Sequence, residues 1–268
     1  MRLTLPAAAA LLAAVQLFAP NRVAHASQRH FGYTYETGTL PAGAFELEPW
    51  FTFSTGREHL YNGFDQRLEL EYGVTDDVMT AIYLNTSAAT FKDDNGALIK
   101  VVDQPGMSWE WKFKLADPVA DAVGVGLYVE LGVKPDEAEL EVKLLLDKQL
   151  GDLLLALNLV AEPEIEVEAD ESEPELKLEF DLAAAWLVSA HLSLGVEVHG
   201  VLVLPEVESV TDGALYAGVT MGYRSQRWWL TVSVLPQIVA LAGATGDSSL
   251  NLTEFERVES RLIVGFDL

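Results

Sequence analysis

The chain's densest set of chemically capable side chains is an acidic run near its middle. Clustered carboxylate oxygens are the ligands that Ca²⁺ and Mg²⁺ prefer, so cation binding is the chemistry that this run suggests. Thiolate chemistry is excluded, because the chain has no cysteine. The acidic residues of the run are Glu162, Glu164, Glu166, Glu168, Asp170, Glu171, Glu173 and Glu175.

A register argument brings two further carboxylates to this run. If the Gln149–Asp152 turn closes as a two-residue loop, Glu139 lies opposite Glu162 and Glu137 lies opposite Glu164. Like charges directly across a strand pair are destabilising. The hypothesis is therefore a Ca²⁺ or Mg²⁺ site that would also bridge lipopolysaccharide phosphates; its ligands would be Glu137, Glu139, Glu162, Glu164 and Glu166. The alternative is a solvated acidic loop whose charges repel each other and spread.

Nucleophilic catalysis has weaker support. Lipid hydrolysis needs a serine and a histidine within reach of each other, and an acid that orients the histidine. His191 is flanked by Ser189 and Ser193 but has no acid nearby, and His199 stands two residues from Glu197. Both histidines are expected to be structural, and no phosphate-binding loop or metal-hydrolase spacing occurs. We expect no enzyme, with an outer-membrane lipid hydrolase as the remote alternative, and no cofactor other than Ca²⁺ or Mg²⁺ at the acidic run.

Most charged residues stand in a two-residue repeat, which is the period of a β-strand. In Met107–Leu115 the odd positions are apolar or aromatic, and the even positions carry Ser, Glu or Lys. Val123–Val133 repeats this pattern with small or polar residues at even positions. One face of each strand is therefore hydrocarbon. A length of roughly nine to eleven residues matches a tilted strand that crosses a membrane.

About twelve such segments follow one another, and single-chain bacterial outer-membrane barrels have an even number of strands. Short connections mostly alternate with longer ones, which is typical of these barrels and would place both termini in the periplasm. The expected strands are Ala44–Thr55, Gly63–Tyr72, Val78–Thr90, Met107–Leu115, Val123–Val133, Ala138–Lys148, Leu153–Glu162, Pro174–Ala184, Leu192–Leu202, Ala214–Tyr223, Trp228–Ile238 and Glu254–Leu268.

Alternation alone does not distinguish this barrel from a soluble β-sandwich, which also has one apolar face. Here the apolar face runs almost uncharged through nearly all strands and would overfill a sandwich core. Aromatic residues such as Trp109 and Trp228 gather near strand ends, as at membrane interfaces, and the last strand alternates up to Leu268. The sequence therefore predicts an all-β fold, a transmembrane antiparallel up-and-down β-barrel of about twelve strands over residues 44–268. The alternative is a secreted soluble β-protein.

Charge and the N-terminal residues bear on location and partners. The formal charge of −24 would repel nucleic acid. Residues 1–26 combine a basic start, an apolar run and an Ala-His-Ala ending, which is typical of a signal peptide cut before Ser27. Residues 27–43 would form an extra strand, a periplasmic tail or a plug in a pore. We expect export to the bacterial outer membrane.

If the apolar face meets lipid, the polar face lines the lumen. Acids outnumber bases on this face, which favours a narrow pore with a slight preference for cations. The alternative is a filled lumen in which the charges interlock as ion pairs. The residues expected to line the lumen are Arg67, Glu69, Glu71, Glu110, Lys112, Lys114, Tyr128, Glu130, Glu139, Glu141, Lys143, Lys177, Glu179, Asp181, Glu197 and His199.

Several motifs resemble a family of uncharacterised proteobacterial outer-membrane barrels, similar in style to putative transporters of the phenol-degradation (MetA-pathway) type. The last strand resembles the C-terminal targeting strand of such barrels, although it ends in Leu268 where Phe or Trp is usual. The resemblance implies transport of small, often apolar molecules and implies no particular contact residue. The motifs are GTLPAG at 38–43, ELEPW at 46–50, ELEYGVTD at 69–76 and WWLTVSVLPQ at 228–237.

The sequence thus favours a channel or transporter for small solutes. The rival is a closed structural or surface barrel that binds divalent cations or lipopolysaccharide. In both cases we expect the partners to be the lipid bilayer, lipopolysaccharide and the barrel-assembly machinery. Small solutes would be partners only if the protein is a channel. Nucleic acid is not expected as a partner of either kind of barrel.

Overall fold

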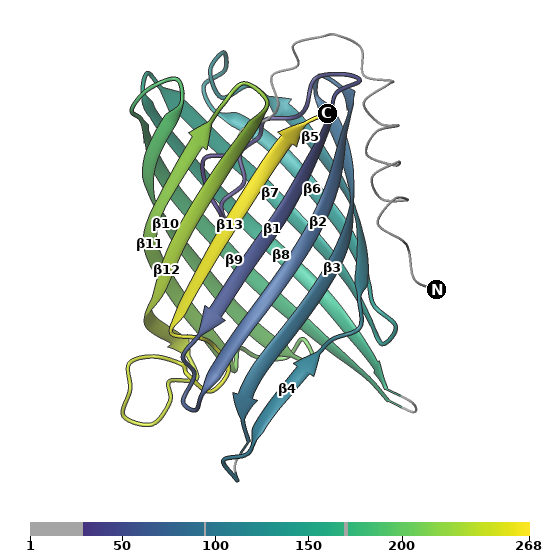
Figure 1. Cartoon of the computed structure of the whole chain (residues 1–268), viewed down its shortest axis with the longest axis vertical. Helices are drawn as coiled ribbons and strands as arrows, with labels where there is room; N and C mark the ends of the chain where they lie inside the picture. Colours follow the sequence, from purple (N-terminus) through teal and green to yellow (C-terminus); the bar gives the residue numbers. More distant parts are fainter. Residues whose placement is uncertain (1–28, 94, 169–170) are drawn as a thin grey trace, which may run out of the picture.

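A closed ring of antiparallel strands forms the molecule (Figure 1). The computed structural model describes residues 29–93, 95–168 and 171–268. Its elements are β1 (Phe45–Thr55), β2 (Tyr61–Thr75), β3 (Val78–Lys92), β4 (Leu98–Val102), β5 (Gly106–Ala116), β6 (Gly124–Val133), β7 (Glu137–Leu150), β8 (Leu153–Glu168), β9 (Glu171–Leu187), β10 (Leu192–Pro205), β11 (Asp212–Arg224), β12 (Trp228–Ala242) and β13 (Val258–Asp267).

Twelve of these strands close the barrel. Each pairs antiparallel with two neighbours around the ring, which the β1–β13 and β2–β3 pairings close, so that none of these twelve strands is an edge strand. The short β4 pairs with β3 outside the ring, in a connection where the sequence predicted no strand. The predicted all-β antiparallel barrel of about twelve strands is therefore confirmed.

The two faces of each strand differ as the alternation predicts. Met107, Trp109 and Leu131 point outward and are at least half exposed, whereas Glu110 and Glu130 are each only 1% exposed. A wall with this pattern presents hydrocarbon to its surroundings and encloses charge, which is the arrangement that a lipid bilayer requires.

The two ends of the barrel differ in their connections. One end, the turn end, carries the C-terminus and the short connections, including residues 76–77, 151–152 and 225–227 (Figure 1, top). The other end, the loop end, carries β4 and the connection of residues 243–257. At the turn end, Asp117 accepts hydrogen bonds from the backbone N–H groups of Ala120 and Val119, and these bonds lower the pKa of Asp117.

The β7–β8 hairpin corrects the predicted register. Leu150 pairs with Leu153, so the two loop residues are Gly151 and Asp152. Gly151 has φ +63°, which suits the first central position of a type II′ turn. Glu139 therefore lies opposite Glu164, and Glu137 lies opposite Glu166. The expected pairings of Glu139 with Glu162 and of Glu137 with Glu164 were wrong by two residues, because the turn closes one residue later.

No helix in the part of the chain that the structure describes is long and apolar enough to cross a membrane.

A charge on the outer face should destabilise the barrel in lipid. Val219 is near the middle of β11 and is 63% exposed. Val219→Arg is expected to cost about 2–4 kcal/mol of unfolding free energy in lipid vesicles, because the guanidinium would be placed in hydrocarbon. Val119→Arg, in an exposed connection at the turn end, is the control and should change it by less than about 1 kcal/mol. Equal effects of the two substitutions in urea titrations would contradict a lipid-facing outer surface.

Candidate functional site

A segment that belongs to no strand occupies the lumen at the turn end. We call residues 29–43 the inner segment. Its apolar side chains are enclosed by the barrel: Phe31 is fully buried, and Tyr33 and Tyr35 are 5% and 6% exposed. In Figure 1 the inner segment is the purple trace that passes inside the wall before β1 begins. The chain therefore fills part of its own lumen.

The deepest part of the inner segment is held by one carboxylate. Glu197 on β10 accepts backbone hydrogen bonds from Gly32 (2.9 Å), Tyr33 (2.8 Å) and Thr34 (3.1 Å), and is itself fully buried. Ser233 on β12 also donates to Glu197. Buried backbone N–H groups need acceptors, and a segment without a strand partner must find them on side chains. Glu197 is thus the central attachment point of the inner segment.

Two further barrel side chains complete the attachment. Asn158 on β8 accepts from the Tyr35 N–H at 2.6 Å and donates to the Tyr35 carbonyl at 2.8 Å. Asp147 on β7 accepts from the backbone N–H and the hydroxyl of Thr37. Neither Asn158 nor Asp147 was among the predicted lumen residues. The sequence feature that could have identified them is a polar residue at an inward-facing position of a strand that is otherwise rich in leucine.

Cations and aromatic rings pack around the inner segment. The Arg29 guanidinium lies 3.7 Å from the centre of the Tyr35 ring and 4.4 Å from that of Trp50. The Lys143 ammonium lies 4.2 Å from the centre of the same Tyr35 ring. Such cation–π contacts gain strength when they are desolvated. They anchor Tyr35 against the barrel wall.

The inner segment also contains an ion pair of its own. His30 Nδ1 lies 2.7 Å from a carboxylate oxygen of Glu36, and the backbone N–H of His30 donates to the same carboxylate. Burial alone would lower the pKa of His30, but the charge and hydrogen bonds of Glu36 outweigh it, so the pKa of His30 is raised. Burial alone would raise the pKa of Glu36, but His30 outweighs it, so the pKa of Glu36 is lowered. Both shifts favour a charged pair.

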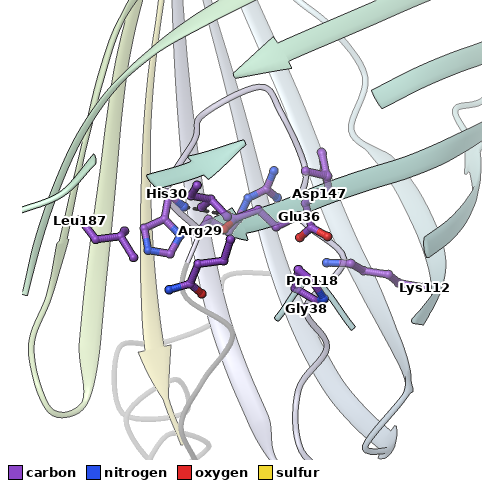
Figure 2. Close-up of a pocket in the computed structure, with 11 residues that line it drawn as sticks. Arg29, His30, Glu36, Gly38, Lys112, Pro118, Asp147 and Leu187 are labelled. Carbon is purple, nitrogen blue, oxygen red and sulfur yellow. Dashed lines mark hydrogen bonds and ion pairs between the residues drawn. The ribbon is translucent and has the colours of Figure 1, made fainter. Parts of the chain in front are cut away.

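A cavity of about 250 Å³ adjoins the inner segment at the turn end (Figure 2). Arg29, His30 and Glu36 line it from the inner segment, and Lys112 and Asp147 line it from the barrel wall. Sites for drug-sized ligands usually exceed roughly 300 Å³. The cavity is lined by these charged groups together with apolar residues such as Leu154 and Leu187, and its volume suits water or a small solute.

The predicted lumen residues lie on the inward face in two groups. Ten are buried: Glu69, Glu71, Glu110, Lys112, Tyr128, Glu130, Glu141, Lys143, Asp181 and Glu197. The half-buried ones are Arg67, Lys114, Glu139, Lys177, Glu179 and His199.

Several of these charges pair with each other inside the lumen, within one strand, between neighbouring strands or between strands farther apart in the ring. Arg67 lies 3.5 Å from Glu130, Lys143 lies 2.7 Å from Glu141, and His199 lies 2.7 Å from Asp181. Tyr128 donates a hydrogen bond to Glu130. Lys114 instead pairs with Asp77 at the turn end, at 3.1 Å. Ion pairs and the inner segment together leave less open lumen than a bare ring of strands would.

The predicted metal ligands come together only in part. Glu137, Glu139 and Glu164 each place one oxygen within 4.8 Å of the others, at the loop end. Lys134 pairs with Glu137 at 2.7 Å, and Lys177 pairs with Glu164 at 2.7 Å and with Glu162 at 3.4 Å. The side chain of Glu166 is outside the described part of the structure. Lysines therefore already offset some of the charge that a metal would balance.

The candidate hydrolase residues point their polar atoms at the backbone. His191 Nδ1 lies 2.9 Å from the Arg224 carbonyl, and Ser189 Oγ accepts from the His191 N–H. The Ser193 hydroxyl, which is buried, faces the Gly222 carbonyl at 3.5 Å. The contacts of these residues are those of a structural turn.

Removing the Asn158 amide should loosen the inner segment. Asn158→Leu keeps the number and branching of the side-chain heavy atoms but leaves the buried N–H and carbonyl of Tyr35 without partners, at a cost of about 1–3 kcal/mol for each unsatisfied group. Hydrogen exchange at Tyr35 should become at least tenfold faster. Asn85→Leu, which loses a hydrogen bond to Ser108 elsewhere in the lumen, should leave this exchange unchanged. Equal exchange in both variants would show that Asn158 does not hold the segment.

The His30–Glu36 pair should make the inner segment sensitive to pH. A raised His30 pKa contributes stability fully below the unfolded value of about 6.5 and loses it as pH rises through the folded pKa. A lowered Glu36 pKa contributes stability above the unfolded value of about 4.5 and loses it as pH falls through the folded pKa. Protection of residues 30–36 against exchange, corrected for intrinsic rates, should therefore decline on the alkaline side. His30→Gln should abolish this decline, and an unchanged decline in that variant would refute the assignment.

Comparison with known proteins agrees with the fold. The structure is similar to the NanC porin, with TM-score 0.50 and 8% identity over 84% of this chain and all of the other. It is also similar to the β-domain of the Bordetella autotransporter BrkA, with TM-score 0.55 and 8% identity over 85% of this chain and all of the other. Identities this low indicate a shared outer-membrane barrel fold and nothing finer.

Sequence comparison leaves the activity open. No curated protein matches the chain. A family model matches residues 23–268, which is nearly the whole sequence. The chain therefore belongs to the family of unknown function DUF6662.

Proposed function

We propose that this protein is a narrow channel of the bacterial outer membrane for small solutes, restricted by its inner segment. The observation that carries the proposal is a closed barrel with an apolar exterior and a charged, polar interior that retains a 250 Å³ cavity at the turn end. A purely structural barrel has no need to keep so many charges in its lumen, because buried charges cost free energy unless they are paired.

Cations are the favoured solutes. Among the described side chains that are less than about a tenth exposed, twelve are acidic and two, Lys112 and Lys143, are basic. A pore lined by one sign of charge attracts the opposite ion and repels its own. The motif resemblance to phenol-degradation transporters adds a second group to test, small apolar molecules that cross as neutral species.

The inner segment is the proposed restriction. It is held in the lumen by side chains such as Glu197, Asn158 and Asp147, and not by a continuous strand ladder. Such a segment can shift at lower cost than a barrel strand, since fewer backbone hydrogen bonds must break. Movement of the inner segment would widen the path at the turn end.

The orientation and route to the membrane follow the general design of such barrels. Short connections usually face the periplasm, so the turn end and both termini would lie there. Residues 1–26 would direct export and be removed, and the barrel-assembly machinery would insert residues 44–268 into a membrane that carries lipopolysaccharide.

Planar-bilayer recording tests the channel. The wild type should show small, discrete, cation-selective currents. Glu197→Ala should raise the mean conductance several-fold, because three backbone N–H groups of the inner segment lose their acceptor. Glu208→Ala, in an exposed connection at the loop end, is the matched control and should behave as the wild type. Persistent silence of both wild type and Glu197→Ala would refute the channel.

The rival function, a closed barrel that binds divalent cations or lipopolysaccharide, has one observation in its favour. Glu137, Glu139 and Glu164 converge at the loop end. Lys134 and Lys177 weaken the case for a metal there, because they already form ion pairs with Glu137 and Glu164. Calorimetric titration with Ca²⁺ distinguishes the two functions. Loss of Ca²⁺ binding in Glu139→Gln would support this rival. A heat of Ca²⁺ binding that the substitution leaves unchanged would oppose it.

A further inference from the structure

A second acidic cluster, which the sequence did not single out as a metal site, lies near the turn end. We call Glu46, Glu48, Glu69 and Glu71 the hairpin cluster, because β1 and β2 supply two residues each. Glu46 lies opposite Glu71 and Glu48 lies opposite Glu69 in the strand register. All four point into the lumen and are 0 to 5% exposed. Two directly opposed pairs of like charge are therefore buried next to each other, which needs compensation.

The hydrogen bonds of the hairpin cluster leave a specific set of oxygens free. One oxygen of Glu46 accepts from the Trp229 indole N–H, and Glu48 Oε2 accepts from the Trp50 indole N–H at 3.0 Å. The remaining oxygens, Glu46 Oε2 and Glu48 Oε1, are buried and have no hydrogen-bond donor within the described structure. The same holds for Glu69 Oε2 and Glu71 Oε2. Buried polar atoms are rarely left without a partner, so four together indicate a missing ligand.

The free oxygens also have suitable spacing. Glu46, Glu48 and Glu71 each offer one carboxylate oxygen within 4.8 Å of the other two. Ligand oxygens lie about 2.4 Å from Ca²⁺, so two on opposite sides of the ion are about 4.8 Å apart. Glu69, which lies opposite Glu48 in the strand register, adds a fourth buried carboxyl group.

Nearby protein cations do not balance the hairpin cluster. Three cations act electrostatically on the hairpin cluster: Arg29 on Glu48 and Glu69, Lys112 on Glu48 and Glu71, and Arg67 on Glu69. Lys112 is shared with Glu110, and Arg67 is shared with Glu130. The four carboxylates therefore outnumber the positive charges around them. The loop-end acids differ, because Lys134 and Lys177 form direct ion pairs with them.

We propose that the hairpin cluster binds one divalent cation, with Ca²⁺ preferred over Mg²⁺. Four carboxylates offer the several oxygen ligands and the flexible geometry that Ca²⁺ accepts, whereas Mg²⁺ keeps more of its water. The indole N–H groups of Trp50 and Trp229 donate to Glu48 and Glu46 and so orient two of the ligands. The ion also lies at the seam of the barrel, since Glu46 on β1 reaches Trp229 on β12 across β13. It would fasten β1 to β2 directly and would fix the contact of Glu46 with Trp229 across the seam, whether or not the barrel conducts.

Terbium luminescence tests the site directly, because Tb³⁺ replaces Ca²⁺ and emits when a nearby tryptophan is excited. Full mature barrel in detergent, freed of metal by chelator, should show saturable Tb³⁺ emission that Ca²⁺ displaces. Glu48→Gln with Glu71→Gln should weaken Tb³⁺ binding at least tenfold. The matched control, Glu137→Gln with Glu139→Gln, should leave it unchanged. No saturable emission, or emission lost only in the control, would overturn the proposal.

Thermal unfolding gives a second readout that does not depend on the probe. Chelator should lower the unfolding midpoint of the wild type, and Ca²⁺ should restore it. The Glu48→Gln, Glu71→Gln variant should ignore Ca²⁺ and, in chelator, should melt at or above the wild type, because the substitutions remove like-charge repulsion. A wild-type midpoint that ignores chelator and Ca²⁺ but rises on mild acidification would mean that protons, and not a metal, neutralise the cluster, and would refute the proposal.

Discussion

Closure of the strand ring is the constraint on which the rest of the structure depends. In hydrocarbon every backbone N–H and carbonyl must find a partner within the protein, and a sheet satisfies them all only when its first and last strands pair. Here β1 pairs with β13 from Glu46–Asp267 to Thr55–Val258. Once the ring is closed, each strand has one face toward lipid and one toward the lumen.

Closure has a consequence for charge. The outer face must be apolar, so the charged side chains of the strands collect inside, where acids predominate. Ion pairs such as Lys143–Glu141 and His199–Asp181 offset part of this charge. Some carboxylates find other partners: Glu197 binds backbone N–H groups of the inner segment. The hairpin cluster remains underbalanced, and this imbalance is the physical basis for the proposed cation.

The inner segment both satisfies acidic side chains of the lumen and restricts the proposed path for solutes. Its backbone donors satisfy lumen carboxylates, and its aromatic side chains fill space between the walls. Because the inner segment is attached by side chains, its attachment can be altered one contact at a time without breaking the barrel. The inner segment is not part of the strand ring, so loosening it would leave the pairing of the barrel strands unchanged.

The sequence by itself determined the strands, their two faces and the barrel class, because a two-residue repeat places alternate side chains on opposite faces whatever the register. It also placed residues such as Glu110 and Glu197 on the inward face. Only the tertiary structure decided which residues meet across strands. The β7–β8 register depended on a turn that closes at Gly151 and Asp152, and the path of the inner segment depended on side chains from β7, β8 and β10. Glu46 and Glu71 are far apart in the chain and converge because the β1–β2 register places them opposite each other, which local periodicity does not specify.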